Sequence, residues 1–488
     1  MTAVNSTSEP TSEIGTPRVP LIINGQQLFT QDFFHVKSPI SGDVVYEGSA
    51  ATLSEAQAAI EAANAAFPAW RDTPAVKRRD IFLRAAEVLE RRRYELANYM
   101  IAETGATRPW ADFNLSTAKE FLIDIAGRIG SISGFIPTTQ SPNTGAFVFK
   151  EPFGVVLGVA PWNAPYILGT RAIAFPIAAG NTAILKGSEL SPHVMWGIAS
   201  IFEEAGLPPG VLNFITHAPK DAAAVTEHLI AHPQIKKVNF TGSTTVGRII
   251  GQLAGKYIKP VLLELGGKAP AIVWEDADLE TAVTQCALGS FLNSGQICMS
   301  TERIIVHSKV KTDFEKKLKE KLQQLFDPEA DAPVLVQAAS VEKNAKLVSD
   351  ALSKGAKLIH GDLADLQGTR MRPLVLSGVS KDADIYWTES FGTSVSIYTV
   401  ETEAEAIELA NDTEYGLSAA VFTNDLGRGL RIAKSIESGA VHINSMTVHD
   451  ESALPHGGVK ASGFGRFNGK AIEEWVKTKT VTFQIDSL

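Results

Sequence analysis

Apolar residues between positions 154 and 242 form short continuous runs separated by amphipathic segments. The runs are GVVLGVAP, NTAILKG, GVLNFIT and KKVNFTG. The segments between them, such as HVMWGIASIFEEAGLPPG, carry apolar residues at a helical period. Continuous apolar strands that alternate with helices are typical of a parallel sheet covered on both faces. The pattern therefore predicts an α/β domain here, and the same alternation after residue 265 predicts a second one.

Two helical stretches precede the first series. The capping pair Ser54 and Gln57 predicts the start of the first helix, and a second helical run, residues 75–105, ends at Gly105. The stretch 131–151 is rich in turn residues and predicts a protruding hairpin. Near the C-terminus, TKTVTFQID alternates like an edge strand, which could extend a sheet of this chain or of a neighbouring subunit.

Composition narrows the class of protein. A chain of 488 residues exceeds what one core usually serves, and 44% hydrophobic with 20% charged residues is ordinary for a globular protein. The net charge of -9 and the scattered basic residues make nucleic acid an unfavourable partner. No apolar run reaches the ~18 residues of a membrane span. With two cysteines and no secretory signal at the start, we expect a cytoplasmic protein.

Cys298 is the first candidate for chemistry. It lies in the glycine-tagged loop SGQICMS, whereas Cys286 lies among small apolar residues typical of a buried helix. A single free cysteine is usually a packing residue, so Cys298 by itself is compatible with either a structural or a nucleophilic role.

Two sites suit a nucleotide. The run GSTTVG, from Gly242 to Gly247, follows an apolar strand and opens a helix, where backbone N–H groups can bind an anion or can simply be capped. Lys186 and Glu189 follow another strand, where they could hold the two hydroxyls of a ribose or form a surface ion pair.

Two further side chains could support a nucleophile. Glu264 lies among leucines, where burial would raise its pKa and make it a general base, although a glutamate beside two glycines also suits capping of backbone amides. Asn163 lies between two prolines and could donate to an oxyanion or serve a turn. His228 and His232 lack a third ligand, so we expect no metal site.

In combination, the motifs resemble those of the aldehyde dehydrogenase superfamily from about residue 20 to the end. The motifs, in order, are PWNAP, LKGSE, FTGSTTVG, LELGGK, GQIC, ESFG, NDTEYGLSA and PHGGVKASGFGR. The resemblance implies a Rossmann-like NAD-binding domain, a second α/β catalytic domain and a small β hairpin for oligomerisation. The implied boundaries are a disordered tail at 1–18, the dinucleotide-binding domain at 19–130 and 152–264, the catalytic domain at 265–464, and the oligomerisation segment at 131–151 and 475–488. The last two segments are expected to pair between subunits of a homodimer or homotetramer.

The resemblance also implies a role for each matched residue. Cys298 would attack the aldehyde carbonyl, the Asn163 side chain and the Cys298 N–H would hold the oxyanion, and Glu264 would activate the water that hydrolyses the thioester. Cofactor binding would use Trp162, Lys186, Glu189, Gly242, Ser243, Gly247, Leu265, Glu389 and Phe391. A carboxylate at position 189 would favour NAD over NADP, with NADP also possible.

The motif GQICMSTERIIV, the C-terminal sequence and a short connection, FDPEADAPVLVQAAS, resemble the branch containing salicylaldehyde, vanillin and benzaldehyde dehydrogenases. Aromatic aldehydes are therefore the expected substrates, with a pocket lined by Trp110, Tyr166, Leu168 and Ile297. Alternatives are a semialdehyde or aliphatic aldehyde dehydrogenase, a coenzyme-A-acylating enzyme, which would not need Glu264, and a non-catalytic protein on the same scaffold, which would have lost Cys298, Asn163 or Glu264.

Overall fold

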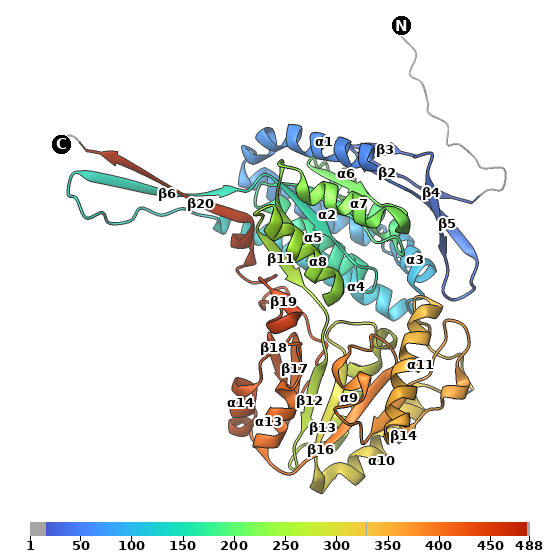
Figure 1. Cartoon of the computed structure of the whole chain (residues 1–488). Helices are drawn as coiled ribbons and strands as arrows, with labels where there is room; N and C mark the ends of the chain where they lie inside the picture. The colour runs from blue at the N-terminus through green and yellow to red at the C-terminus, as the bar shows by residue number, and fades with distance from the viewer. Residues whose placement is uncertain (1–15, 328, 486–488) are drawn as a thin grey trace.

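Two α/β bodies and a projecting two-stranded ribbon make up the molecule (Figure 1). The structure is a computed structural model, and it describes residues 16–327 and 329–485. The N-terminal body carries α1 to α8, the second body carries α9 to α14, and the ribbon extends away from the N-terminal body (Figure 1). Within the described residues, no helix is long and apolar enough to cross a membrane.

The first body is built on an eight-stranded sheet. Its central strands β11, β10, β7, β8 and β9 are parallel, and β19, β2 and β3 are added antiparallel at the edges. In sheet order the strands are β19 Gly463–Phe464, β11 Val261–Glu264, β10 Ile235–Thr241, β7 Val155–Val159, β8 Thr182–Lys186, β9 Leu212–Ile215, β2 Leu21–Ile23 and β3 Gln26–Leu28. The predicted parallel sheet is therefore present, and its strands are the apolar runs.

Helices cover both faces of this sheet, as the apolar strands require. One face packs against α1 Leu53–Arg71, α7 Ala222–Ala231 and α8 Thr244–Lys256. The other packs against α2 Ala75–Arg91, α3 Arg93–Thr104, α4 Arg108–Arg128, α5 Pro165–Ala178 and α6 Pro192–Glu204. Helix α5 is buried along its whole length.

Two sequence expectations for the early helices need correction. Helix α1 is capped by Thr52, not Ser54, because the Thr52 side chain accepts from the backbone while Glu55 reaches back to the Thr52 N–H. The run 75–105 is two helices, divided at Arg92, whose φ of -94° and ψ of 9° leave the helical region.

The second body contains a seven-stranded sheet. Its strands are parallel except for the β14–β15 pair at one edge. In sheet order they are β14 Lys357–His360, β15 Leu374–Ser377, β16 Ser394–Val400, β13 Thr301–His307, β12 Ala269–Val273, β17 Ser418–Phe422 and β18 Ala440–Ile443. The helices are α9 Leu279–Phe291, α10 Ser308–Leu325, α11 Ala338–Ser353, α12 Asp384–Trp387, α13 Glu403–Asn411 and α14 Leu426–Ser435. Cys286 is buried in α9, as predicted.

The chain returns from the second body to the first before residue 464. Strand β19 pairs antiparallel with β11, so Gly463 lies beside Glu264, and the predicted boundary at 464 falls inside the first sheet. The predicted tail also ends too late, because Arg18 belongs to strand β1, Arg18–Val19, and forms an ion pair with Glu47. Residues 1–15 lie outside the described part. With β5 Val44–Ser49 and β4 Phe33–Lys37, β1 forms a three-stranded sheet that the sequence did not predict.

The ribbon consists of β6, Thr144–Pro152, and β20, Val476–Gln484. The two strands pair antiparallel over their whole length within this chain, from Val476 opposite Pro152 to Gln484 opposite Thr144. The edge strand is thus confirmed for the described part of 475–488, of which 486–488 lie outside it. A local hairpin within 131–151 is reduced to one bridge between Phe135 and Val148, because the long pairing partner of β6 comes from the C-terminus.

Candidate active site

The loop before Cys298 has an unusual backbone. Asn293, Ser294 and Gly295 are consecutive residues with positive φ, at 48°, 59° and 72°. A Cβ on Gly295 would lie 2.0 Å from the Gly392 carbonyl oxygen, so this position requires glycine. The tight turn directs the chain from α9 to the interface between the two bodies, where Cys298 lies.

Cys298 opens into a cavity of about 220 Å³ at the carboxyl ends of the central strands of the first sheet. Most of the predicted site residues are brought together around it. Predicted residues that line it are Trp162, Asn163, Leu168, Gly242, Ser243, Glu264, Leu265, Cys298, Glu389 and Phe391. Ligands of open α/β sheets bind at this edge of the sheet. The cavity therefore joins the candidate nucleophile to the candidate nucleotide site.

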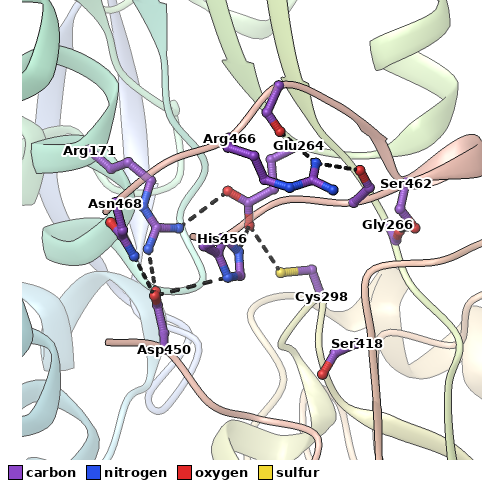
Figure 2. Close-up of polar contacts among 12 residues, drawn as sticks. Arg171, Glu264, Gly266, Cys298, Ser418, Asp450, His456, Ser462, Arg466 and Asn468 are labelled. Atoms are coloured by element: carbon purple, nitrogen blue, oxygen red, sulfur yellow. Dashed lines mark hydrogen bonds and ion pairs between the residues drawn. The ribbon is translucent and has the colours of Figure 1, made fainter. Parts of the chain in front are cut away.

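Glu264 is the last residue of β11 and is only 1% exposed. Its Oε1 accepts from the Cys298 thiol at 3.6 Å and lies 3.1 Å from His456 Nε2, while Oε2 accepts from Arg171 at 3.3 Å (Figure 2). Burial disfavours the charged carboxylate, but His456 and Arg171 outweigh it and lower the pKa of Glu264 to about 2. The predicted upward shift is wrong, because the local leucines do not show the two basic partners.

The pKa of the Cys298 thiol is shifted in the opposite direction, upward. Burial, followed by the negative charges of Glu264 and Glu389, raises its pKa well above the ordinary value. The thiol proton lies between Sγ and a carboxylate that is ionised, so the sulfur is protonated in this state and Glu264 is the nearest proton acceptor.

Asn163 is held rigidly at the cavity wall. Its side-chain amide donates to the Gln296 backbone carbonyl at 3.0 Å, and the backbone carbonyl of Asn163 accepts from Trp110 Nε1 at 3.2 Å and from the Asn293 side chain at 3.1 Å. A side-chain amide has two N–H donors, so one remains for an oxyanion in the cavity. The alternative that Asn163 only serves a turn does not explain these contacts to distant segments.

Lys186 is the last residue of strand β8, and Glu189 follows the strand, as predicted. Lys186 is 9% exposed, and its ammonium has no hydrogen-bond or ion-pair partner among the described residues. Burial lowers its pKa, opposed by the charge of Glu189. A buried donor with no partner is costly, and the hydroxyls of a ribose would satisfy it. The residues present therefore fit the adenosine end of a dinucleotide.

The turn after β10 has two separate roles. Ser243 caps α8 by accepting from the Val246 N–H at 3.3 Å, and the positive end of this helix faces the cavity. Gly247 lies behind it, where an added Cβ would approach Leu265 to 2.3 Å. Gly247 is therefore a packing residue that lets α8 approach the sheet.

The ESFG loop, residues 389–392, is held in place by the buried ion pair of Lys268 and Glu302. Glu302 accepts from the backbone N–H groups of Ser390 and Phe391 at 2.8 and 3.2 Å, and from Lys268 at 2.5 Å. Phe391 has a positive φ of 52°, which turns its ring toward Trp162 at 5.9 Å. Glu389 accepts from the Gly267 N–H at 2.8 Å, and burial together with Glu302 raises its pKa to about 7.

The predicted substrate residues are only partly brought together. Leu168 lines the cavity, but Tyr166 is fully buried and donates to the Leu96 carbonyl at 2.7 Å. Trp110 supports Asn163 and stacks on Phe113, and Ile297 belongs to the same core cluster. Of the four, Leu168 alone is at the cavity surface, and the others support that wall from behind.

Sequence reasoning missed five residues at the site. Arg171 and His456 contact Glu264, Asp450 pairs with Arg171 and accepts from Asn468, and Lys343 lines the cavity. One signal was present: Arg171 is the only charged residue in the apolar helix α5. The other four lie in loops or on exposed helix faces, where polar residues are ordinary.

These features are typical of an α/β oxidoreductase with a half-buried thiol at the end of a dinucleotide cleft. The profile of the "Aldehyde dehydrogenase family" matches residues 27–481. A vanillin dehydrogenase from Pseudomonas fluorescens is 46% identical over 474 residues, covering 96% of this chain and 98% of that protein. The benzaldehyde dehydrogenase [NAD(+)] of Pseudomonas putida is 37% identical over 458 residues and 92% of each chain.

A solved structure agrees with these relatives. The crystal structure of a salicylaldehyde dehydrogenase from Pseudomonas putida G7, complexed with salicylaldehyde, superposes with a TM-score of 0.93 at 38% identity, covering 96% of this chain and 98% of that one. The chain belongs to the aldehyde dehydrogenase family, and the expected fold class is confirmed.

Proposed function

We propose that this protein oxidises aromatic aldehydes to carboxylic acids with NAD, through a thioester on Cys298. The observation that carries the proposal is the single cavity in which Cys298, Glu264 and Asn163 meet Trp162, Ser243 and Glu389. A nucleophile, a base, an oxyanion donor and a nucleotide-binding edge are the groups that this reaction requires.

The proposed reaction uses several groups of this chain in turn. Glu264 accepts the thiol proton, and Cys298 Sγ adds to the aldehyde carbon. The oxyanion of the thiohemiacetal is held by the free amide N–H of Asn163 and the Cys298 backbone N–H. When NAD is bound, its nicotinamide supplies the acceptor for hydride. After the thiol proton has left Glu264 for solvent, the carboxylate takes a proton from the water that attacks the thioester carbon. The C–S bond then breaks with its electron pair returning to sulfur, and the acid leaves.

Cofactor choice depends on Glu189. A carboxylate that accepts a hydrogen bond from the ribose 2'-hydroxyl repels a 2'-phosphate. Lys186 is already buried beside it, so the pair suits NAD, and a relative named for NAD(+) supports this preference. Use of NADP as a weaker substitute is compatible with the same site.

The substrate class follows from the relatives and from the wall around Asn163. The related enzymes are named for vanillin, benzaldehyde and salicylaldehyde, which are all ring aldehydes. Leu168 offers an apolar surface at the cavity, backed by Trp110 and Ile297. A flat ring would bury more apolar area there than a short aliphatic chain would. A coenzyme-A-acylating reaction is disfavoured, because Glu264 is present and aimed at Cys298.

Assembly as a homodimer or homotetramer is part of the proposal. The ribbon leaves Phe147, Phe149 and Phe483 exposed at 39%, 46% and 40%. A contiguous aromatic patch on a projecting ribbon suits burial against another copy. Light scattering after gel filtration would give the mass and distinguish a dimer from a tetramer. Both cysteines are free thiols, which suits a cytoplasmic setting.

A substrate panel tests the function. NADH formation from benzaldehyde, vanillin and salicylaldehyde should exceed that from acetaldehyde by at least ~10-fold in kcat/KM, and NAD should be preferred to NADP. Cys298→Ala should abolish the reaction, with Cys286→Ala as the matched thiol control. Equal rates with acetaldehyde would contradict the aromatic assignment, and an active Cys298→Ala protein would contradict the mechanism.

A further inference from the structure

His456 lies between two buried carboxylates. Its Nε2 is 3.1 Å from Glu264 Oε1, and its Nδ1 is 4.0 Å from Asp450 Oδ1 (Figure 2). The ring is only 8% exposed on its side chain, and its backbone is fixed by reciprocal hydrogen bonds with Phe467 at 2.9 and 2.7 Å. Asp450 in turn is held by an ion pair with Arg171 and by Asn468 at 2.9 Å.

The two oxygens of Glu264 have different partners. Oε2 accepts from Arg171, whose guanidinium lies between the rings of Phe121 and Phe467 at 5.1 and 5.0 Å. Arginine does not release a proton in proteins, so this oxygen is fixed as an acceptor. Oε1 is shared by Cys298 and His456, and it is the oxygen that a proton from the reacting centre would reach.

We propose that His456 is a positioning residue whose imidazole removes the proton from Glu264 during thioester hydrolysis. Asp450 faces the other ring nitrogen of His456. The inference deepens the proposed function and rests on hydrolysis at Cys298. Two described side chains contact Glu264 Oε1, the Cys298 thiol and the His456 imidazole, and an imidazole has one nitrogen that can accept a proton and another that can donate one.

The proton balance is complete without a further reactant. Water oxygen bonds to the acyl carbon, and one water proton goes to Glu264 Oε1. The C–S bond breaks and the electron pair returns to sulfur. When His456 is neutral with its hydrogen on Nδ1, facing Asp450, Nε2 accepts the proton from Oε1 and Glu264 is again ionised for the next cycle. The imidazolium between the two carboxylates later releases a proton to solvent.

The charges around His456 come from every element packed against it. Glu264 on β11 and Asp450 in the preceding loop face its two ring nitrogens, and Arg171 on α5 pairs with both carboxylates. Cys298 shares Glu264 Oε1, and His442 on β18 interacts with the charge of His456. Burial, then His449 and His456, lower the pKa of His442 to about 4, so His442 is neutral and does not compete for the proton at neutral pH. The two carboxylates beside His456, Glu264 and Asp450, are both paired with Arg171.

An ester substrate tests this without an aldehyde or NAD. 4-Nitrophenyl acetate would acylate Cys298 in a burst of nitrophenol, and the steady rate would then report hydrolysis of the acetyl thioester. His456→Asn should retain the burst but slow the steady phase about 100-fold, with the acid limb of its pH profile displaced by a unit or more. His449→Asn, in the same loop but in contact with Glu451, is the matched control.

A conservative variant distinguishes proton transfer by His456 from structural support of Glu264. His456→Gln keeps an N–H donor for Glu264 but cannot carry a proton, so it should be as slow as His456→Asn. If His456→Gln regains the parental rate, or if neither variant changes the pH profile, the inference is overturned. Asp450→Asn should give an intermediate slowing, and an unchanged profile there would also count against the arrangement.

If the variants do not fold, the pH dependence of the wild-type protein still tests the proposal. Its steady phase should carry an acid limb that the burst phase lacks, and a steady phase that stays flat across the acid range would overturn the inference. Failure of the proposed function would look different: aldehydes would give no NADH while the ester reaction kept its two phases.

Discussion

Gly267 lies against the backbone of Cys298, and a Cβ at Gly267 would approach the Cys298 carbonyl oxygen to 2.1 Å. Glycine in the LELGGK motif therefore sets the position of the nucleophile. Gly267→Ala should displace Cys298 and lower kcat/KM about 100-fold, with little change in NAD affinity. Gly255→Ala is the control, because nothing lies within 4 Å of a Cβ there. An active Gly267→Ala enzyme would show that the loop can move without loss.

The charge of Glu264 should be visible in the reactivity of Cys298. Burial raises the pKa of the thiol first, and the Glu264 carboxylate adds to it. Glu264→Gln removes that negative charge, so the thiolate should form at lower pH. Alkylation by iodoacetamide at a fixed pH near neutrality should then be faster, about tenfold for each unit by which the pKa falls. The exposed Glu414→Gln variant is the control, and slower alkylation of Glu264→Gln would contradict the electrostatic account.

Lys186 should contribute to NAD binding while lowering the stability of the ligand-free protein. Its largely buried side chain has no hydrogen-bond or ion-pair partner among the described residues, and burial lowers its pKa. Lys186→Met should leave the ligand-free melting temperature unchanged or raised, while the upward shift produced by NAD should shrink. Differential scanning fluorimetry with and without NAD measures both, with the exposed Lys434→Met as control. An undiminished shift would remove Lys186 from the cofactor site.

Glu103 should make stability depend on pH. It is buried near the end of α3, and its carboxylate accepts from the backbone N–H groups of His193 and Val194 at the start of α6, at 2.7 and 3.0 Å. Burial raises its pKa from 4.5 to about 8 despite these contacts. Between these values the folded state binds more protons than the unfolded state, so the free energy of unfolding falls as pH rises, by up to about 1.4 kcal/mol per unit.

Urea unfolding of Glu103→Gln measures this contribution. The variant cannot titrate at position 103, so its stability should fall less than the parent's between pH 5 and pH 8. Glu87→Gln, on the exposed face of α2, should keep the parental slope. A Glu103→Gln protein with the parental slope would mean that the carboxyl is ionised in the folded state throughout.

Local pattern was enough to predict both sheets and the candidate site. The apolar runs became β7, β8, β9 and β10, and the residues that follow them, including Lys186 and Ser243, lie at the predicted edge. This works because burial on both faces of a parallel strand leaves a continuous apolar signature, and because parallel strands end at a common edge. Cys298 was recognisable from its motif, although its tight turn was not.

Contacts between distant segments were decided by the tertiary structure alone. The sequence places Glu264 among leucines, which suggests a neutral acid, but Arg171 reaches it from 93 residues away and His456 from 192. Likewise β6 found its partner at the C-terminus and not in a local turn. Strand and helix periods are local properties of the chain, whereas the charge of a buried carboxylate depends on which partners packing brings within a few ångströms of it.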